Sequence, residues 1–126
     1  MGSNNIELDE IGLKLIPNYK KCRMRDELSN QKCSKNECGI INLETSNDNG
    51  SHWICYFVND KQKIAVSSFG DPIPKELIDY LGKNIYTSDI QIQEFTEDTC
   101  GFISLLILYL LNEDHKFEDI ILELSK

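Results

Sequence analysis

The sequence has no long hydrophobic run. Its longest mainly apolar stretch, Phe102–Leu111, is far shorter than the roughly 20 residues that a membrane-spanning helix needs. No signal peptide pattern leads the chain, and Ile6 stands where N-myristoylation requires Ser or Thr. We therefore expect an intracellular protein, in the cytoplasm or nucleus, with no membrane association.

Basic residues are scarce in the second part of the chain. Residues 1–70 hold nine basic and nine acidic side chains, whereas residues 71–126 hold four Lys and twelve acidic residues. The second part therefore accounts for the whole net charge of −8. An acidic surface repels phosphate backbones, which argues against nucleic-acid binding and favours a neutral or basic polypeptide as partner.

Histidine is also scarce, and the cysteines lack the spacing of a metal site. Five cysteines, an odd number, argue against a disulfide framework. The spacings Cys22-x10-Cys33-x4-Cys38 match no usual zinc ligand set, and no His lies near them. We expect neither a metal nor another cofactor.

The length of 126 residues fits a single domain. We assign residues 1–19 to an N-terminal segment and residues 20–126 to the domain. Residues 20–39 are polar and rich in Lys, Asn and Cys, which predicts a segment dominated by loops.

Strand signals dominate the middle of the chain. Residues 39–43 form a short β-prone run, and the aromatic and β-branched residues 52–58 give the strongest strand pattern. Asn59-Asp60-Lys61-Gln62 then predicts a turn into a strand over residues 63–69. Residues 52–69 are thus expected to form an antiparallel hairpin.

Helix signals dominate the remainder. The apolar spacing predicts helices over residues 74–81, 100–111 and 117–124, with a further strand over residues 84–95. The helix at 100–111, with Asp98 or Thr99 as its cap, is apolar nearly all round and is expected to be buried. The order of elements predicts an α+β fold with an antiparallel or mixed sheet.

Cys100 occupies the position that suits a reactive thiol. The first turn of a helix presents unpaired N–H groups and the positive end of the helix dipole, and both favour a thiolate. Gly101 has no side chain that would block access to the Cys100 thiol. By itself this is a weak signal, because a free Cys beside an apolar helix is more often a small buried residue. The other four cysteines lack a helix start of their own and are interpreted as structural.

Two histidines could serve as a base. His115 lies among Asn, Asp, Glu and Lys in a turn between helices, and we interpret it as a solvated surface residue. His52 opens the strongest strand directly after a Gly-containing loop, where folds expose functional groups. A surface His at a strand edge is the alternative.

Hairpin pairing predicts what stands beside His52. If residues 59–62 make a turn of even length, residue 54 faces Ser67, and Ser67 lies diagonal to His52 on the same face. A turn of odd length would place Ser68 there instead. In either case a serine occupies the position from which a triad carboxylate would orient the imidazole.

The chain resembles the adenovirus-type processing proteases. Relatives of these proteases occur in large DNA viruses and in Maverick/Polinton transposons, and their site is similar to that of the Ulp-type SUMO proteases. The resemblance covers roughly residues 20–111 and rests on these stretches, in order: Arg25-Asp26-Glu27-Leu28, Glu37-Cys38-Gly39-Ile40-Ile41-Asn42-Leu43, Gly50-Ser51-His52-Trp53, Ser67-Ser68-Phe69-Gly70 with Pro72 and Pro74, Gln91-Ile92-Gln93, and Cys100-Gly101.

The resemblance implies a cysteine-peptidase fold and assigns roles by position. Cys100 would be the nucleophile, His52 its base, and Gln93 would donate its side-chain amide to the oxyanion. Trp53 would shape the site by packing. The implied substrate is a polypeptide, either a viral-type polyprotein or a conjugate of a ubiquitin-like modifier, and the resemblance is consistent with association with virions.

One position departs from the family pattern. The family motif carries Asp or Glu where this chain has Ser67, so the acidic member of the triad is absent. A Cys–His pair suffers less from this loss than a serine protease, because a thiolate can form without a strong base. The sequence therefore leaves three functions open: a peptidase of reduced activity, an inactive descendant kept as a protein-binding module, and an isopeptidase.

Overall fold

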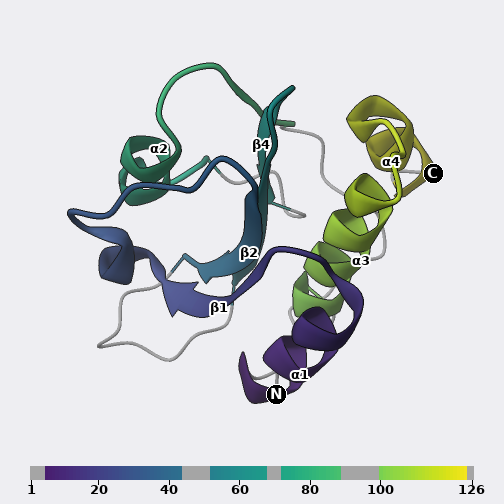
Figure 1. Ribbon diagram of the computed structural model, residues 1–126, viewed down its shortest axis with the longest axis horizontal. Coiled ribbons are helices and arrows are strands. Elements are labelled where there is room, and N and C mark those ends of the chain that lie inside the picture. Colours follow the sequence, from purple (N-terminus) through teal and green to yellow (C-terminus); the bar gives the residue numbers. More distant parts are fainter. Residues whose placement is uncertain (1–4, 44–51, 68–71, 89–99, 125–126) are drawn as a thin grey trace.

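The computed structural model describes residues 5–43, 52–67, 72–88 and 100–124 (Figure 1). The elements follow one another in the order α1 (Asn5–Leu15), β1 (Tyr19–Met24), the 3-10 turn η1 (Arg25–Leu28), β2 (Glu37–Asn42), β3 (Trp53–Val58), β4 (Lys63–Ser67), α2 (Lys75–Leu81), β5 (Ile85–Tyr86), α3 (Cys100–Asn112) and α4 (Phe117–Leu124). This composition confirms the predicted α+β class.

The five strands form one mixed sheet in the order β1-β2-β3-β4-β5. The central pairs β2–β3 and β3–β4 are antiparallel, whereas β1–β2 and β4–β5 at the two edges are parallel. Helices α1, α3 and α4 cover one face of the sheet and α2 covers the other (Figure 1). Every residue of β2 and β3 is buried as a result.

Alternation along β3 divides the core into two halves. Trp53, Cys55 and Phe57 pack on the side of α1, α3 and α4. Ile54 and Tyr56 pack on the opposite side with residues of α2. Successive side chains of a strand point to opposite faces, so the odd-numbered residues of β3 face one helical layer and the even-numbered residues face the other.

The N-terminal part of the chain holds more structure than its sequence predicts. Residues 20–39, expected to be dominated by loops, contain β1, η1 and the start of β2. Edge strand β1 escapes prediction because only Tyr19 is buried in it, so its pattern does not alternate between apolar and polar. Helix α1, within the predicted N-terminal segment, contributes Leu8 to the core and places Gly12 against the Tyr19 ring.

The predicted helices lie at α2, α3 and α4, and α2 begins directly after Pro74. The expectation that α3 is buried all round is wrong, because Phe102, Leu106 and Tyr109 are each 40–41% exposed. Of the strand predicted over residues 84–95, the structure describes β5, while residues 89–95 and the predicted caps at 98 and 99 lie outside the described residues.

A buried charged cluster joins β1, β2, β3 and α2. Glu37, 2% exposed, accepts hydrogen bonds from the hydroxyls of Tyr56 (2.5 Å) and Tyr80, and Arg23 lies 3.4 Å from the same carboxylate oxygen. Burial alone would raise the pKa of Glu37, but these hydrogen bonds, another from the Ser34 N–H and the Arg23 charge hold that pKa below its usual value. The cluster therefore links α2 to the sheet through buried hydrogen bonds.

Candidate active site

The register of the β3–β4 hairpin determines which residues of the two strands lie opposite each other. Ile54 pairs with Ser67 and Val58 with Lys63. The turn between the strands closes through the Asn59 N–H, which donates to the Gln62 carbonyl at 3.0 Å. The predicted turn of even length and its register are confirmed, and the alternative that placed Ser68 in this position is excluded.

His52 lies immediately before β3, and the ladder continues through it. The Leu43 N–H donates to the His52 carbonyl at 2.9 Å, which extends the β2–β3 pairing by one residue beyond Asn42 and Trp53. Alternation along this extended backbone assigns His52 to the sheet face of Ile54 and Ser67. Ser67 is 1% exposed and His52 is half-buried.

Helix α3 begins at Cys100, as predicted, and its far end is anchored beside the end of β3. The Asn112 side-chain amide lies 3.8 Å from the Cys38 sulfur, and Cys38 pairs with Phe57. From Asn112 back to Cys100 the helix rises roughly 18 Å. From Phe57 back to His52 the strand extends roughly 16 Å. The start of α3 and the start of β3 therefore belong to the same end of the domain.

Helix α1 gives an independent check on this direction. A Cβ added at Gly101 would lie 2.7 Å from Leu8 of α1, so the two helices are in close contact near the start of α3. At the other end, the Cys38 thiol donates to the Pro17 carbonyl, 3.6 Å away, just beyond α1. Helices α1 and α3 thus run side by side in the same direction (Figure 1). Packing against Leu8 is also a reason for glycine at position 101, in addition to access to Cys100.

The other proposed groups are placed only in part. Gln93 lies outside the described residues, and the structure describes the backbone of Cys100 but not its side chain. Helix α3 covers the face of Trp53, whereas Ser67 lies on the face of Ile54. The start of α3 and the face assigned to His52 therefore lie on opposite sides of the sheet, at the same end of the domain.

The remaining four thiols are in surroundings that suppress ionisation. Burial raises the pKa of Cys22 and of Cys33 to about 12 and that of Cys38 to about 11. Burial also raises the pKa of Cys55, which is 1% exposed in the middle of β3. A protonated thiol is a poor nucleophile, so these environments agree with the prediction that the four cysteines are structural.

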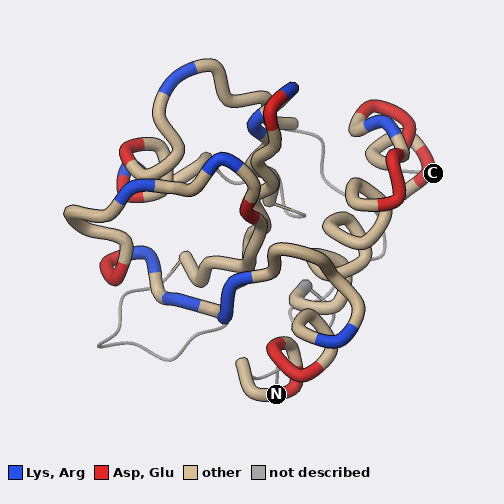
Figure 2. Tube along the Cα trace, viewed as in Figure 1, with Lys and Arg blue, Asp and Glu red and all other residues tan. Residues whose placement is uncertain are grey.

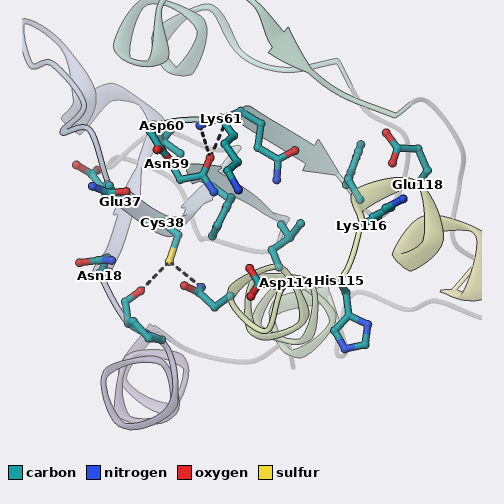
Figure 3. Close-up of a pocket in the computed structure, with 18 residues that line it drawn as sticks. Asn18, Glu37, Cys38, Asn59, Asp60, Lys61, Asp114, His115, Lys116 and Glu118 are labelled. Atoms are coloured by element: carbon teal, nitrogen blue, oxygen red, sulfur yellow. Dashed lines mark hydrogen bonds between the residues drawn. The ribbon is translucent and has the colours of Figure 1, made fainter.

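A large cavity, of about 720 Å³, opens at the opposite end of the domain (Figure 3). It is lined by the start of β2, the ends of β3 and α3 and the turn before α4, and Cys38 lies within it. His115 lies on its rim, and the ring points away from the cavity (Figure 3). His115 is exposed, in agreement with the interpretation of a solvated turn. This cavity does not include His52.

The described residues contain neither a cluster of metal ligands nor a membrane-spanning helix. Within residues 5–43, 52–67, 72–88 and 100–124, no three His, Cys, Asp or Glu side chains are arranged to hold a metal ion. In the same ranges, no helix has both the length and the apolar character needed to cross a membrane.

Comparison with solved structures shows that a viral protease has a similar α+β fold. The structure matches the crystal structure of the African swine fever virus (ASFV) pS273R protease with a TM-score of 0.57 and 18% sequence identity. The match covers 71% of this chain and 39% of the ASFV protein, so the chain spans well under half the length of that protease. No protein-family description matches the sequence, and no curated protein matches it.

Proposed function

We propose that this chain is a cysteine peptidase in which Cys100 is the nucleophile, His52 the general base and Gln93 a donor to the oxyanion. One observation carries the proposal. The helix that starts at Cys100 runs along β3 so that its first turn and His52 belong to the same end of the domain. The likeness of the fold to the ASFV protease supports a peptidase over other Cys–His chemistry.

The chemistry is acyl transfer in two steps. The Cys100 thiolate attacks the carbonyl carbon of the scissile bond, and the resulting oxyanion accepts hydrogen bonds from the Gln93 amide and the Cys100 N–H. Protonated His52 donates its proton to the leaving amine as the C–N bond breaks, which leaves a thioester on Cys100. His52 then takes a proton from water, and the hydroxyl adds to the thioester and releases the acid and the thiol.

Ser67 determines how strong this activity can be. A carboxylate beside the imidazole holds its tautomer and stabilises the imidazolium, and loss of that carboxylate costs a serine protease about four orders of magnitude in turnover. Ser67 cannot supply the negative charge. We therefore expect a thiolate that reacts with electrophiles and a peptidase that works slowly.

An electrophilic peptide probe tests the proposal. A peptidyl vinyl sulfone should modify the native chain at Cys100, and Cys100→Ser should abolish that modification. Cys22→Ser is the matched control, because Cys22 is half-buried in an edge strand, and it should leave the modification unchanged. Labelling spread over several cysteines, or labelling that persists in Cys100→Ser, would contradict the proposal.

A binding module is the second candidate, and the absence of an acid at Ser67 is the observation that favours it. A chain that folds but reacts with no probe and cleaves no peptide library would support binding over catalysis. A panel of ubiquitin-like modifiers that carry an electrophile at their C-terminus distinguishes an isopeptidase from a processing protease. Preferential labelling by such a probe would assign an isopeptidase, and preferential labelling by short peptides would assign a processing protease.

A further inference from the structure

Helix α3 presents a stripe of large apolar side chains to solvent. Phe102, Leu106 and Tyr109 are 41%, 40% and 40% exposed. Their spacing of i, i+4 and i+7 puts them on one face of the helix, away from buried residues such as Leu108. Single exposed apolar residues are ordinary, but three large ones in a row on one helix mark a surface that binds something.

The neighbouring helix α1 also exposes apolar side chains. Ile6 and Leu13 of α1 are 66% and 54% exposed, and seven residues apart they lie on one side of that helix. The buried Leu8 lies on the opposite side of α1. Exposed Glu10 lies between Ile6 and Leu13 on that side of α1, so the continuous apolar stripe is confined to α3.

Acidic residues lie near both ends of α3, and Glu10 lies midway along α1. Helix α3 itself contains no charged residue. Exposed acids lie on α1 (Glu7, Glu10), in the turn after α3 (Glu113, Asp114) and in the first turn of α4 (Glu118, Asp119). Figure 2 shows these acidic groups on either side of an uncharged α3. Lys14 and Lys116 are the basic residues described in the layer of α1, α3 and α4.

We propose that the α3 stripe, defined as Phe102, Leu106 and Tyr109, is a docking surface for an amphipathic helix of a partner polypeptide. The partner's apolar side chains would pack on the stripe, and Lys or Arg residues at both ends of its helix would face the acids. A helix laid along an apolar surface with anchors at i, i+3 or i+4 and i+7 is a common mode of peptide recognition.

The acids at both ends disfavour a second copy of this chain as the occupant. Two copies packed through α3 in antiparallel order would bring the acidic ends of each layer together, and like charges in close contact oppose association. A partner with basic ends gains from the same charges. The inference goes beyond the proposed peptidase function and does not depend on it.

Binding of a synthetic peptide to the whole chain tests the inference. The probe is a fluorescent amphipathic helix of about 16 residues, with Leu at helical spacing and Lys at both ends. A second peptide of equal hydrophobicity carries Glu in place of Lys. We expect the Lys peptide to bind at least about tenfold more tightly in fluorescence anisotropy, and added salt to reduce the difference.

Paired variants locate the binding surface. Leu106→Glu should weaken binding of the Lys peptide by about tenfold or more, because it places a charge in the middle of the stripe. Ile78→Glu is the matched control, because Ile78 is 44% exposed on α2 across the sheet, and it should leave binding unchanged. Thermal melts of both variants establish that each chain is folded.

Several outcomes would overturn the inference. No binding up to millimolar peptide, equal binding of both peptides, or equal loss in the two variants would each exclude the proposed surface. A dimer that forms with concentration in sedimentation and is lost in Leu106→Glu would assign the stripe to a second copy. Binding to phosphatidylcholine vesicles that depends on Leu106, without peptide binding, would assign it to lipid.

Discussion

Ile54 pairs directly with Ser67 across the β3–β4 hairpin. The pairing assigns Ser67, buried at the end of β4, to the position diagonal to His52 on one face of the sheet. An active cysteine peptidase would use a carboxylate at this position to orient its histidine. This register therefore identifies the position at which the proposed site is incomplete.

Replacing Ser67 by Asp should strengthen the site. The new carboxylate can accept a hydrogen bond from the His52 ring and stabilise the Cys100 thiolate–imidazolium pair. Any peptidase activity should rise by about tenfold or more, measured as kcat/KM on a fluorogenic peptide. Ser67→Asn, which has the shape of Asp without its charge, is the control and should give no such gain.

The outcome of this substitution is informative in both directions. A lower activity in Ser67→Asp than in the native chain, with the fold intact by circular dichroism, would mean that Ser67 has a role of its own. No activity in either form, together with an unreactive Cys100, would favour a binding module.

Cys22, Cys33 and Cys38 should resist alkylation at neutral pH. Burial raises the pKa of Cys22 and Cys33 to about 12 and that of Cys38 to about 11, so their thiolate fractions rise about tenfold per pH unit up to those values. Iodoacetamide labelling followed site by site from pH 7 to 10 measures this rise. Rapid labelling of all three at pH 7 in folded protein would contradict it.

The same raised pKa values predict a loss of stability in alkali. The folded state disfavours the thiolates, whereas thiols in the unfolded chain ionise near pH 8.5. The free energy of unfolding should therefore be unaffected by these groups below about pH 8.5 and should fall above it. Urea unfolding at pH 7.5 and pH 10 checks the direction, and Cys55→Ala should reduce the dependence because burial raises the pKa of Cys55 as well.

Glu37→Gln should destabilise the fold by about 2–4 kcal/mol at pH 7, because it removes the negative charge that Arg23, Tyr56 and Tyr80 all contact. The pKa of Glu37 is held low in the folded state, so its contribution is present above about pH 4.3 and is lost as the pH falls below that value. Urea unfolding from pH 7 to pH 3 should show the native chain and the variant converging. A difference that stays constant with pH would contradict the account.

Gly12→Ala should destabilise the chain by about 1–2 kcal/mol. Alanine is the better helix former, but its Cβ would lie 2.5 Å from the Tyr19 ring, whose hydroxyl donates to Asp9 at 2.9 Å. Leu13→Ala, one residue further along α1, is the control and should change stability by less than about 0.5 kcal/mol because Leu13 is exposed. Equal effects of the two variants would show that α1 is not packed on β1.

Local patterns in the sequence predict a large part of this fold. The hairpin register follows from the four residues of its turn, because a turn of even length leaves one pairing that keeps the apolar residues of β3 and β4 on matching faces. Helix α4 follows from the spacing of Phe117, Ile120 and Ile121, and α3 from its apolar content and its start at Cys100.

Features that depend on distant partners are beyond such patterns. Strand β1 pairs in parallel with β2 along one edge, so most of its side chains remain polar, and nothing local marks it as a strand. The solvent-exposed face of α3 cannot be predicted from its sequence. The helix is apolar on all sides, so no polar residues mark the side that faces solvent. In the site, local patterns predict the start of α3 and the hairpin neighbours of His52. Whether the Cys100 thiol reaches the imidazole depends on packing between separate elements, which local patterns do not encode.

The alkylation rate of Cys100, measured with and without His52, tests the central claim most directly. Native protein is treated briefly with iodoacetamide at pH 7, and each cysteine is quantified by mass spectrometry in the native chain and in His52→Ala. The account predicts that Cys100 alone reacts rapidly and that His52→Ala slows this reaction by about tenfold or more. Reaction of Cys100 no faster than that of Cys22, Cys33 and Cys38, or at the same rate in both proteins, would contradict it.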